Sequence, residues 1–152
     1  MTGCVYFIDN DILRKLAIFN LFDETLKLLN ASREQARILA TARYKFERDW
    51  EKLKNKRAKN DQDKFINYEK TIELIETSSQ MSVETVYQDL FLRLSEFEGI
   101  DQGEAILISH VIKALQEDRS AQVFMLTGDK RFLKALVKVE MPMIQIGLVH
   151  RF

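Results

Sequence analysis

The hydrophobic positions of this chain fall into a few short apolar runs and several longer stretches with helical spacing. The runs at 4–8 (CVYFI) and 121–126 (AQVFML) predict strands that are buried on both faces, as is typical of a parallel sheet. A last run at 141–148 predicts a third strand, and the only proline, Pro142, suits its first residues. Strands separated by helical stretches predict an α/β fold, and the length favours a single domain over 1–152.

Helices are predicted wherever apolar residues recur every three or four positions. The first predicted helix is 12–22, and residues 23–29 either extend it or form a helix of their own. A helical stretch follows Ser32 and includes Leu39, Ala42, Phe46 and Leu53. The remaining predicted helices are 65–75, 83–94, 105–116, which Asp101 caps, and 131–139. Ser32 and Gln35 have the spacing of a capping box. SSQMS (78–82) is predicted to be a break, with Ser82 as the cap of the helix that follows. The polar range 52–64 is compatible with an exposed helix or a loop.

Composition adds limits on the class of protein. Hydrophobic residues make up 46% and charged residues 30% of the chain, which is typical of a soluble globular protein. No apolar run approaches the roughly 18 residues that a membrane helix needs. One cysteine excludes an internal disulfide, and the first residues turn acidic too soon for a signal peptide. We therefore expect a cytoplasmic protein without a membrane partner.

The net charge is zero, which argues against a uniformly basic nucleic-acid binder. The charge is unevenly distributed, however, because 43–64 holds nine Lys or Arg against five Asp or Glu. Only two histidines are present, so a metal ion would be held by oxygen atoms. Oxygen ligands favour magnesium or manganese over zinc or copper.

Three carboxylates are predicted to meet at one edge of the sheet. Asp9 directly follows the first buried strand, and Asp129 follows the second after Thr127 and a glycine. In a parallel sheet both then lie at the carboxyl edge, where open α/β sheets place their ligands. Glu104 lies in the first turn of the helix that leads into the second strand. Because such a helix runs antiparallel to its strand, Glu104 is expected at the same edge.

Each acid also has a purely structural interpretation. Asp101 and Glu104 fit a capping box, Asp129 fits a turn or a helix cap, and Asp9 fits a cap of the helix after it. The combination is more informative, because clustered carboxylates repel one another unless a cation lies among them. Such a cluster holds Mg²⁺ or Mn²⁺, which lowers the pKa of a bound water and stabilises charge on a phosphodiester.

Three segments resemble the PIN-domain family of metal-dependent ribonucleases. VYFIDNDIL is similar to the family's opening strand, IDQGEAILIS to a D-x-G-E-A segment of one branch, and LTGDKRFLKAL to its T-x-D-x-x-F segment. The resemblance implies an α/β/α sandwich with a short parallel sheet, Mg²⁺ or Mn²⁺, and single-stranded RNA as substrate. It implies Asp9, Glu104 and Asp129 as metal-site residues and Thr127 as a supporting hydroxyl. Homodimers are common in the family, and many members of this size are toxins paired with a protein antitoxin.

The chain departs from the family pattern in three places. The family usually presents a further acid from a helix in the first half, for which Glu34 and Glu47 are candidates, and Asp101 is a further unranked candidate for the missing acid. Asp11 stands where Asn or Ser is commoner, so it is a candidate extra metal ligand or an exposed cap. The polar helical region 43–80 is a candidate insertion that grips RNA or a partner, or else a solvated helical face.

Two other functions stay open. Asp9-Asn10-Asp11 also resembles the D-x-D start of haloacid-dehalogenase-like phosphatases, with Asp9 as nucleophile, but Leu13 stands where that class has a threonine. The third interpretation is a PIN-like module that binds RNA or protein without turnover. A toxin, a defence nuclease and a processing enzyme would share all of these sequence features.

Overall fold

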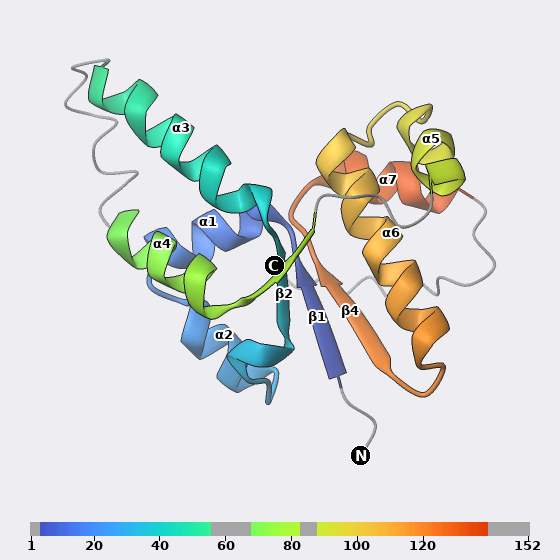
Figure 1. The fold of residues 1–152 in the computed structure, drawn as a ribbon, viewed down its shortest axis with the longest axis horizontal. Coiled ribbons are helices and arrows are strands. Elements are labelled where there is room, and N and C mark those ends of the chain that lie inside the picture. Colours follow the sequence, from blue (N-terminus) through green and yellow to red (C-terminus); the bar gives the residue numbers. More distant parts are fainter. Residues whose placement is uncertain (1–3, 56–67, 83–87, 140–152) are drawn as a thin grey trace.

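The computed structural model describes residues 4–55, 68–82 and 88–139, and its centre is a parallel sheet. The described strands are β1 (Cys4–Ile8), β2 (Ala36–Leu39), β3 (Ser79–Met81) and β4 (Gln122–Leu126), in the order β3-β2-β1-β4 (Figure 1). All three strand pairings are parallel, and β1 lies between β2 and β4. All four strands therefore end at the same edge, which we call the carboxyl edge of the sheet.

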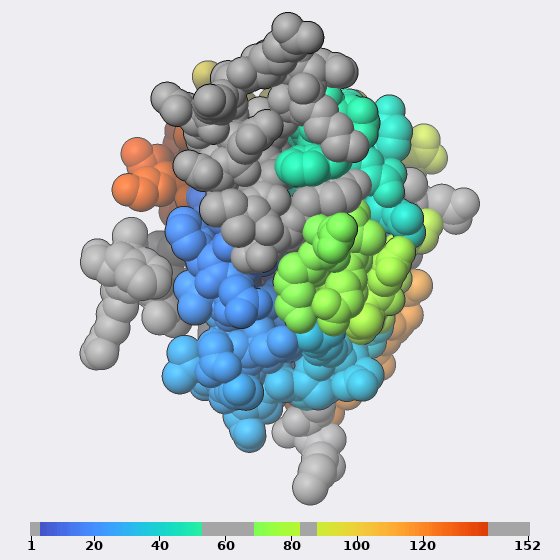
Figure 2. Space-filling view, turned by 90° about the vertical axis from the view of Figure 1, so that its left-hand side faces the viewer, coloured from blue at the N-terminus to red at the C-terminus, as the bar shows by residue number. Residues whose placement is uncertain are grey.

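Helices flank this sheet. They are α1 (Asn10–Ile18), α2 (Phe22–Leu28), α3 (Thr41–Asn55), α4 (Tyr68–Thr77), α5 (Gln88–Ser95), α6 (Gln102–Glu117) and α7 (Lys130–Lys138), with a 3₁₀ turn, η1 (Arg33–Gln35), before β2. In Figure 1, α1 to α4 lie on one side of the sheet and α5 to α7 on the other. Figure 2 views the molecule from the first side, where α1, α2 and α4 form much of the surface.

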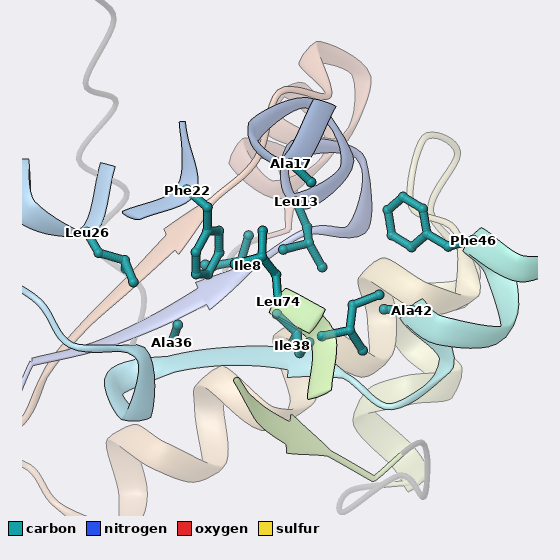
Figure 3. Packing of buried hydrophobic residues seen from close by; sticks show 11 residues of the cluster. Ile8, Leu13, Ala17, Phe22, Leu26, Ala36, Ile38, Ala42, Phe46 and Leu74 are labelled. Carbon is teal, nitrogen blue, oxygen red and sulfur yellow. The ribbon is translucent and has the colours of Figure 1, made fainter. Parts of the chain in front are cut away.

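The alternation of side chains along the strands builds a core on each face. Ile8 and Ile38 pack against the first group of helices, together with Leu13 of α1 and Leu74 of α4 (Figure 3). Phe7 and its neighbours on β2 and β3 pack instead against α6. Fully burying one such aliphatic side chain stabilises the fold by roughly 1.5–3 kcal/mol, so both helical groups are held by the sheet.

Two elements predicted between residues 32 and 82 are wrong. Residues 36–39 were expected in the helix after Ser32, but they form β2, and the capping box of Ser32 and Gln35 caps only the single turn of η1. The range 78–82, predicted as a break, contains β3. Both strands are short: Ala36–Leu39 reads equally as buried helix or strand, and β3 has only three residues, with Met81 buried.

The helix predicted over 12–22 is also corrected. It is two helices, because α1 ends at Ile18 and the chain turns through Asn20, whose φ is +54°. Asparagine tolerates this left-handed conformation better than most residues. Phe19, at the end of α1, is 69% exposed. Residues 23–28 belong to the second helix, α2.

Most of the second half follows its prediction. The strand at the chain start is β1, the run 121–126 contains β4, Asp101 caps α6, and α7 lies within one residue of the predicted helix 131–139. The predicted strand 141–148, residues 83–87 and 56–67 lie outside the described residues. Within the described ranges no helix is long and apolar enough to cross a membrane.

Candidate functional site

The carboxyl edge carries an open hollow between the ends of β1 and β4. Its volume is about 430 Å³. The residues that line it, mostly charged, are Asp9, Asp11, Lys45, Asp101, Glu104, Gly128, Asp129, Lys130 and Arg131. The structure thus places Asp9, Glu104 and Asp129 around one space, although they are up to 120 positions apart in the sequence. Topology brings them there, because each follows a strand end or begins a helix at this edge.

Asp9 is the central acid of the hollow. Its backbone N–H donates to the carbonyl of Leu126 at 3.0 Å, which extends the pairing of β1 and β4 by one residue. Its carboxylate Oδ2 accepts a hydrogen bond from the hydroxyl of Thr127 at 3.2 Å, and that hydroxyl also accepts from the backbone N–H of Asp129 at 3.2 Å. Burial raises the pKa of Asp9 above its ordinary value, and the bond from Thr127 partly offsets this.

Glu104 is the most buried acid of the site, with 8% of its surface exposed. It forms the predicted capping box: the N–H of Glu104 donates to Asp101 Oδ1, and the N–H of Asp101 donates to Glu104 Oε2, each at 2.8 Å. Burial, together with the negative charges of Asp101, Asp129 and Asp9, raises the pKa of Glu104 to about 7, against the lowering effect of the capping bond. Glu104 therefore forms the predicted helix cap, and its carboxyl group also lies among the negative charges of neighbouring acids.

Asp129 caps α7. Its Oδ1 accepts hydrogen bonds from the backbone N–H groups of Arg131 at 2.7 Å and Phe132 at 3.3 Å. These bonds hold the pKa of Asp129 below its ordinary value. Its Oδ2 lies 3.6 Å from a guanidinium nitrogen of Arg131. Asp129 is thus ionised near neutral pH, and one of its oxygens is committed to the helix.

The acids surround the hollow without converging on one point. In the described ranges, no three Asp, Glu, His or Cys side chains lie close enough together to hold a metal ion. Helix amides engage one carboxylate oxygen of Glu104 and one of Asp129, so each of these acids has one oxygen bound in a cap. The donor set itself, hard carboxylate oxygens only, suits Mg²⁺ or Mn²⁺. One ion held by all three acids requires their carboxylates to lie closer together than they do in the described residues.

The candidates for a further acid fall into two groups. Asp11 and Asp101 line the hollow. Asp11, however, forms ion pairs with Lys15 at 2.6 Å and Arg14 at 3.1 Å, and the bond from Lys15 holds its pKa low. The remaining candidates do not line it: Glu34 lies in η1 at the opposite edge of the sheet, and Glu47 pairs with Arg43 along α3.

The sequence patterns did not select the basic residues that line the hollow, which are Lys45, Lys130 and Arg131, and Lys45 is the one farthest from the predicted site segments in the sequence. It lies in the second turn of α3, which starts at the carboxyl edge because it follows β2. The excess of Lys and Arg in 43–64 was the sequence feature that could have pointed to a basic residue at the site. Recognising 36–39 as a strand would have placed the start of α3, and hence Lys45, beside Asp9.

Comparisons of this chain with protein-family models, curated proteins and solved structures give no match. The functional argument consequently depends on the geometry and electrostatics of the site.

Proposed function

We propose that this protein is a PIN-like, metal-dependent endoribonuclease that hydrolyses phosphodiester bonds of single-stranded RNA with Mg²⁺ or Mn²⁺. The observation that carries the proposal is the gathering of Asp9, Glu104 and Asp129 around one hollow at the carboxyl edge. A buried carboxyl group with a pKa of about 7 among other acids is the electrostatic mark of a functional site.

The electrostatics favour a cation in this hollow. Burial and the neighbouring acids disfavour the ionised forms of Asp9 and Glu104, and a divalent cation would reverse both effects. Asp9, Glu104 and Asp129 would hold the ion, which would supply a water of lowered pKa and stabilise charge on the phosphodiester. Thr127 would keep Asp9 oriented, because its hydroxyl donates to Asp9 and accepts from the backbone of Asp129.

The fold supports the PIN-like part of the proposal. Helices on both faces of a parallel sheet correspond to the three-layer α/β/α sandwich that the resemblance implies. The candidate insertion 43–80 holds most of α3 and all of α4, and β3 begins near its end. A homodimer, a protein antitoxin as partner, and a toxin or defence role belong to the same proposal and come from the resemblance. The cytoplasmic location in the proposal comes instead from the composition and the first residues of the sequence.

One contact weighs against the phosphatase alternative. In that mechanism Asp11 would act as the acid/base, but its ion pairs with Lys15 and Arg14 hold its pKa low. A carboxylate that stays ionised at neutral pH is a poor proton donor. The binding-module alternative is favoured by one observation, the lack of convergence of the acids among the described residues.

The test is cleavage of single-stranded RNA with Mn²⁺ by the wild type, Asp9→Asn and Asp118→Asn. Asp118 is the matched control because it lies at the other end of α6 from the hollow. We expect Asp9→Asn and a chelator each to lower cleavage at least about 100-fold, because metal-site residues have effects of this order or larger. Asp118→Asn should cleave like the wild type.

Three outcomes would overturn the proposal. Cleavage that survives both the chelator and Asp9→Asn would come from another site or a contaminant. A phospho-aspartate trapped on the wild type would identify a phosphatase. Binding of RNA without cleavage at any Mn²⁺ concentration would favour the binding module.

A further inference from the structure

A polyanion that enters this hollow meets several carboxylates, so its binding needs cations that are not already neutralised. Arg131 lies beside Asp129, and Arg14 and Lys15 are both paired with Asp11. Among the described residues, the lining cations without an ion pair within 4.0 Å are Lys45 and Lys130. These two are therefore the side chains available to an incoming phosphate.

Lys45 is the better placed of the two. Its positive charge acts on Asp9, where it lowers the pKa against the effect of burial. A second, smaller hollow of about 80 Å³ shares Asp11 and Lys45 with the first. Lys45 therefore lies between two spaces at the carboxyl edge, and it is itself exposed. Its ammonium group can reach a ligand in the main hollow from the side of α3.

The face of α3 beside Lys45 carries an aromatic side chain. Tyr44 is 67% exposed, and the guanidinium of Arg48 lies 6.0 Å from the centroid of its ring. At 100° per residue, Tyr44, Arg48 and Lys45 fall within a 100° arc of the helix surface. The opposite side of α3 packs into the core through Ala42 and Phe46. An exposed ring with an adjacent cation is a platform on which a base can stack.

We propose that Lys45 binds a backbone phosphate of single-stranded nucleic acid at the hollow, and that Tyr44 with Arg48 carries an adjoining base. The combination specifies the ligand class, because a free phosphate ester would use the lysine and have no need of the ring. The inference takes its substrate from the proposed nuclease function, but it concerns binding and does not require turnover.

The test measures the affinity of a labelled single-stranded oligouridylate by fluorescence anisotropy at several KCl concentrations. Ca²⁺ replaces Mn²⁺ so that binding is measured apart from cleavage. The variants are Lys45→Met, Tyr44→Ala and the control Lys134→Met, whose lysine lies one turn beyond Lys130 on α7 and does not line the hollow. Mn²⁺ affinity of each protein is measured separately, without RNA.

Each variant has a distinct expected signature. Lys45→Met should weaken binding about tenfold and reduce the slope of log affinity against log salt by about 0.7, the value for one phosphate contact of a single strand. Tyr44→Ala should weaken binding about tenfold with the salt slope unchanged, because stacking releases no counterion. Lys134→Met should match the wild type. Lys45→Met should also bind Mn²⁺ more tightly, since a positive charge near Asp9 is removed.

A merely structural role of Lys45 would not raise Mn²⁺ affinity while lowering RNA affinity. If Lys45→Met and Lys134→Met behave alike, or if the wild type does not bind the oligonucleotide, the inference is overturned. If cleavage depends on Asp9 while Lys45→Met binds normally, the inference fails and the nuclease proposal stands. If the binding signatures appear without any cleavage, the inference stands and the nuclease proposal fails.

Discussion

Two acidic groups at opposite edges of the sheet show how differently this fold treats carboxylates. At the amino edge, Asp23 accepts two hydrogen bonds from the guanidinium of Arg33, both at 2.9 Å, and this pairing holds its pKa below the ordinary value. At the carboxyl edge, Glu104 is buried among other acids and its pKa is raised to about 7. The carboxylate of Asp23 is paired with a fixed cation, Arg33, whereas Glu104 lies among other negative charges.

The difference separates a charge that is paired within the fold from the charges that the proposed function would use. Arg33 also donates to Thr77 and lies 3.6 Å from Glu73, so the amino-edge group ties η1 to α2 and α4. The carboxyl-edge acids reduce the stability of the folded chain when they are ionised together. Under the proposed function, a cation supplied from solution would remove this cost.

Replacing Glu104 with Gln should have the largest effect on stability. Gln keeps the capping bond to Asp101 and removes the buried charge. A pKa raised from 4.5 to about 7 corresponds to a penalty of roughly 3 kcal/mol on the ionised form. At pH 8 we therefore expect Glu104→Gln to raise the free energy of unfolding by about 2–3 kcal/mol, measured by urea denaturation without metal.

The pH dependence of that gain has a definite sign. Wild-type stability contributed by Glu104 is complete below its unfolded pKa of about 4.5 and is lost as pH rises through about 7. The advantage of the variant should hence disappear near pH 4.5. Glu69→Gln, an exposed change on α4, is the control and should be neutral. If Glu104→Gln instead lowers the free energy of unfolding at pH 8, the ionised Glu104 carboxylate does not destabilise the folded chain.

Replacing Asp23 with Asn should have a smaller effect of the opposite sign. Asp23 is about half exposed and solvent screens its pairing, so we expect a loss of about 1 kcal/mol at pH 7. A lowered folded pKa contributes stability above the unfolded pKa of 3.8 and loses it as pH falls through the folded value. The variant and the wild type should consequently become equal once the pH lies below the folded pKa of Asp23.

The control for Asp23 is Glu24→Gln on the same helix. Glu24 pairs with Lys27, and both side chains are more than 60% exposed. Its loss should be below about 0.5 kcal/mol. Equal losses for the two variants would remove the distinction between a structural ion pair and a surface contact.

Replacing Thr127 with Val should have the smallest effect on stability, at most about 1 kcal/mol. It removes the hydroxyl that donates to Asp9, and this bond lowers the pKa of Asp9. The pKa of Asp9 should rise further, and the carboxyl carbon resonance followed against pH by NMR measures it. Thr25→Val on α2 also loses a hydroxyl and should leave Asp9 unchanged. An unchanged Asp9 in Thr127→Val would remove Thr127 from the site.

The parts of the fold that could be predicted are those whose pattern is long or has a distinctive cap. The apolar runs of β1 and β4 predicted strands, the spacing of Asp101 and Glu104 predicted the start of α6, and the structure confirms all three elements. The short strands β2 and β3 were not predicted, because four or three residues carry too little periodicity. Missing β2 also hid the position of α3 and therefore Lys45.

The sequence was sufficient to predict which edge of the sheet carries the acids, but not how their side chains are oriented. Sequence order and helix direction suffice to bring Asp9, Glu104 and Asp129 to the carboxyl edge. Which way each carboxylate turns depends on competition between helix amides and the other acids. The sequence offered both interpretations for Glu104, and in the structure its carboxylate bonds the cap while the charges around it remain.

The most direct test of the central claim is a crystal structure determined with Mn²⁺, using anomalous diffraction to locate the ion. The account predicts a manganese peak in the hollow, with oxygens of Asp9, Glu104 and Asp129 at the short distances of hard-cation ligands, about 2.0–2.6 Å. Glu104 and Asp129 should have turned away from their present hydrogen bonds. An ordered hollow without a peak at saturating Mn²⁺, or a manganese bound elsewhere while Asp9 has no metal contact, would contradict the account.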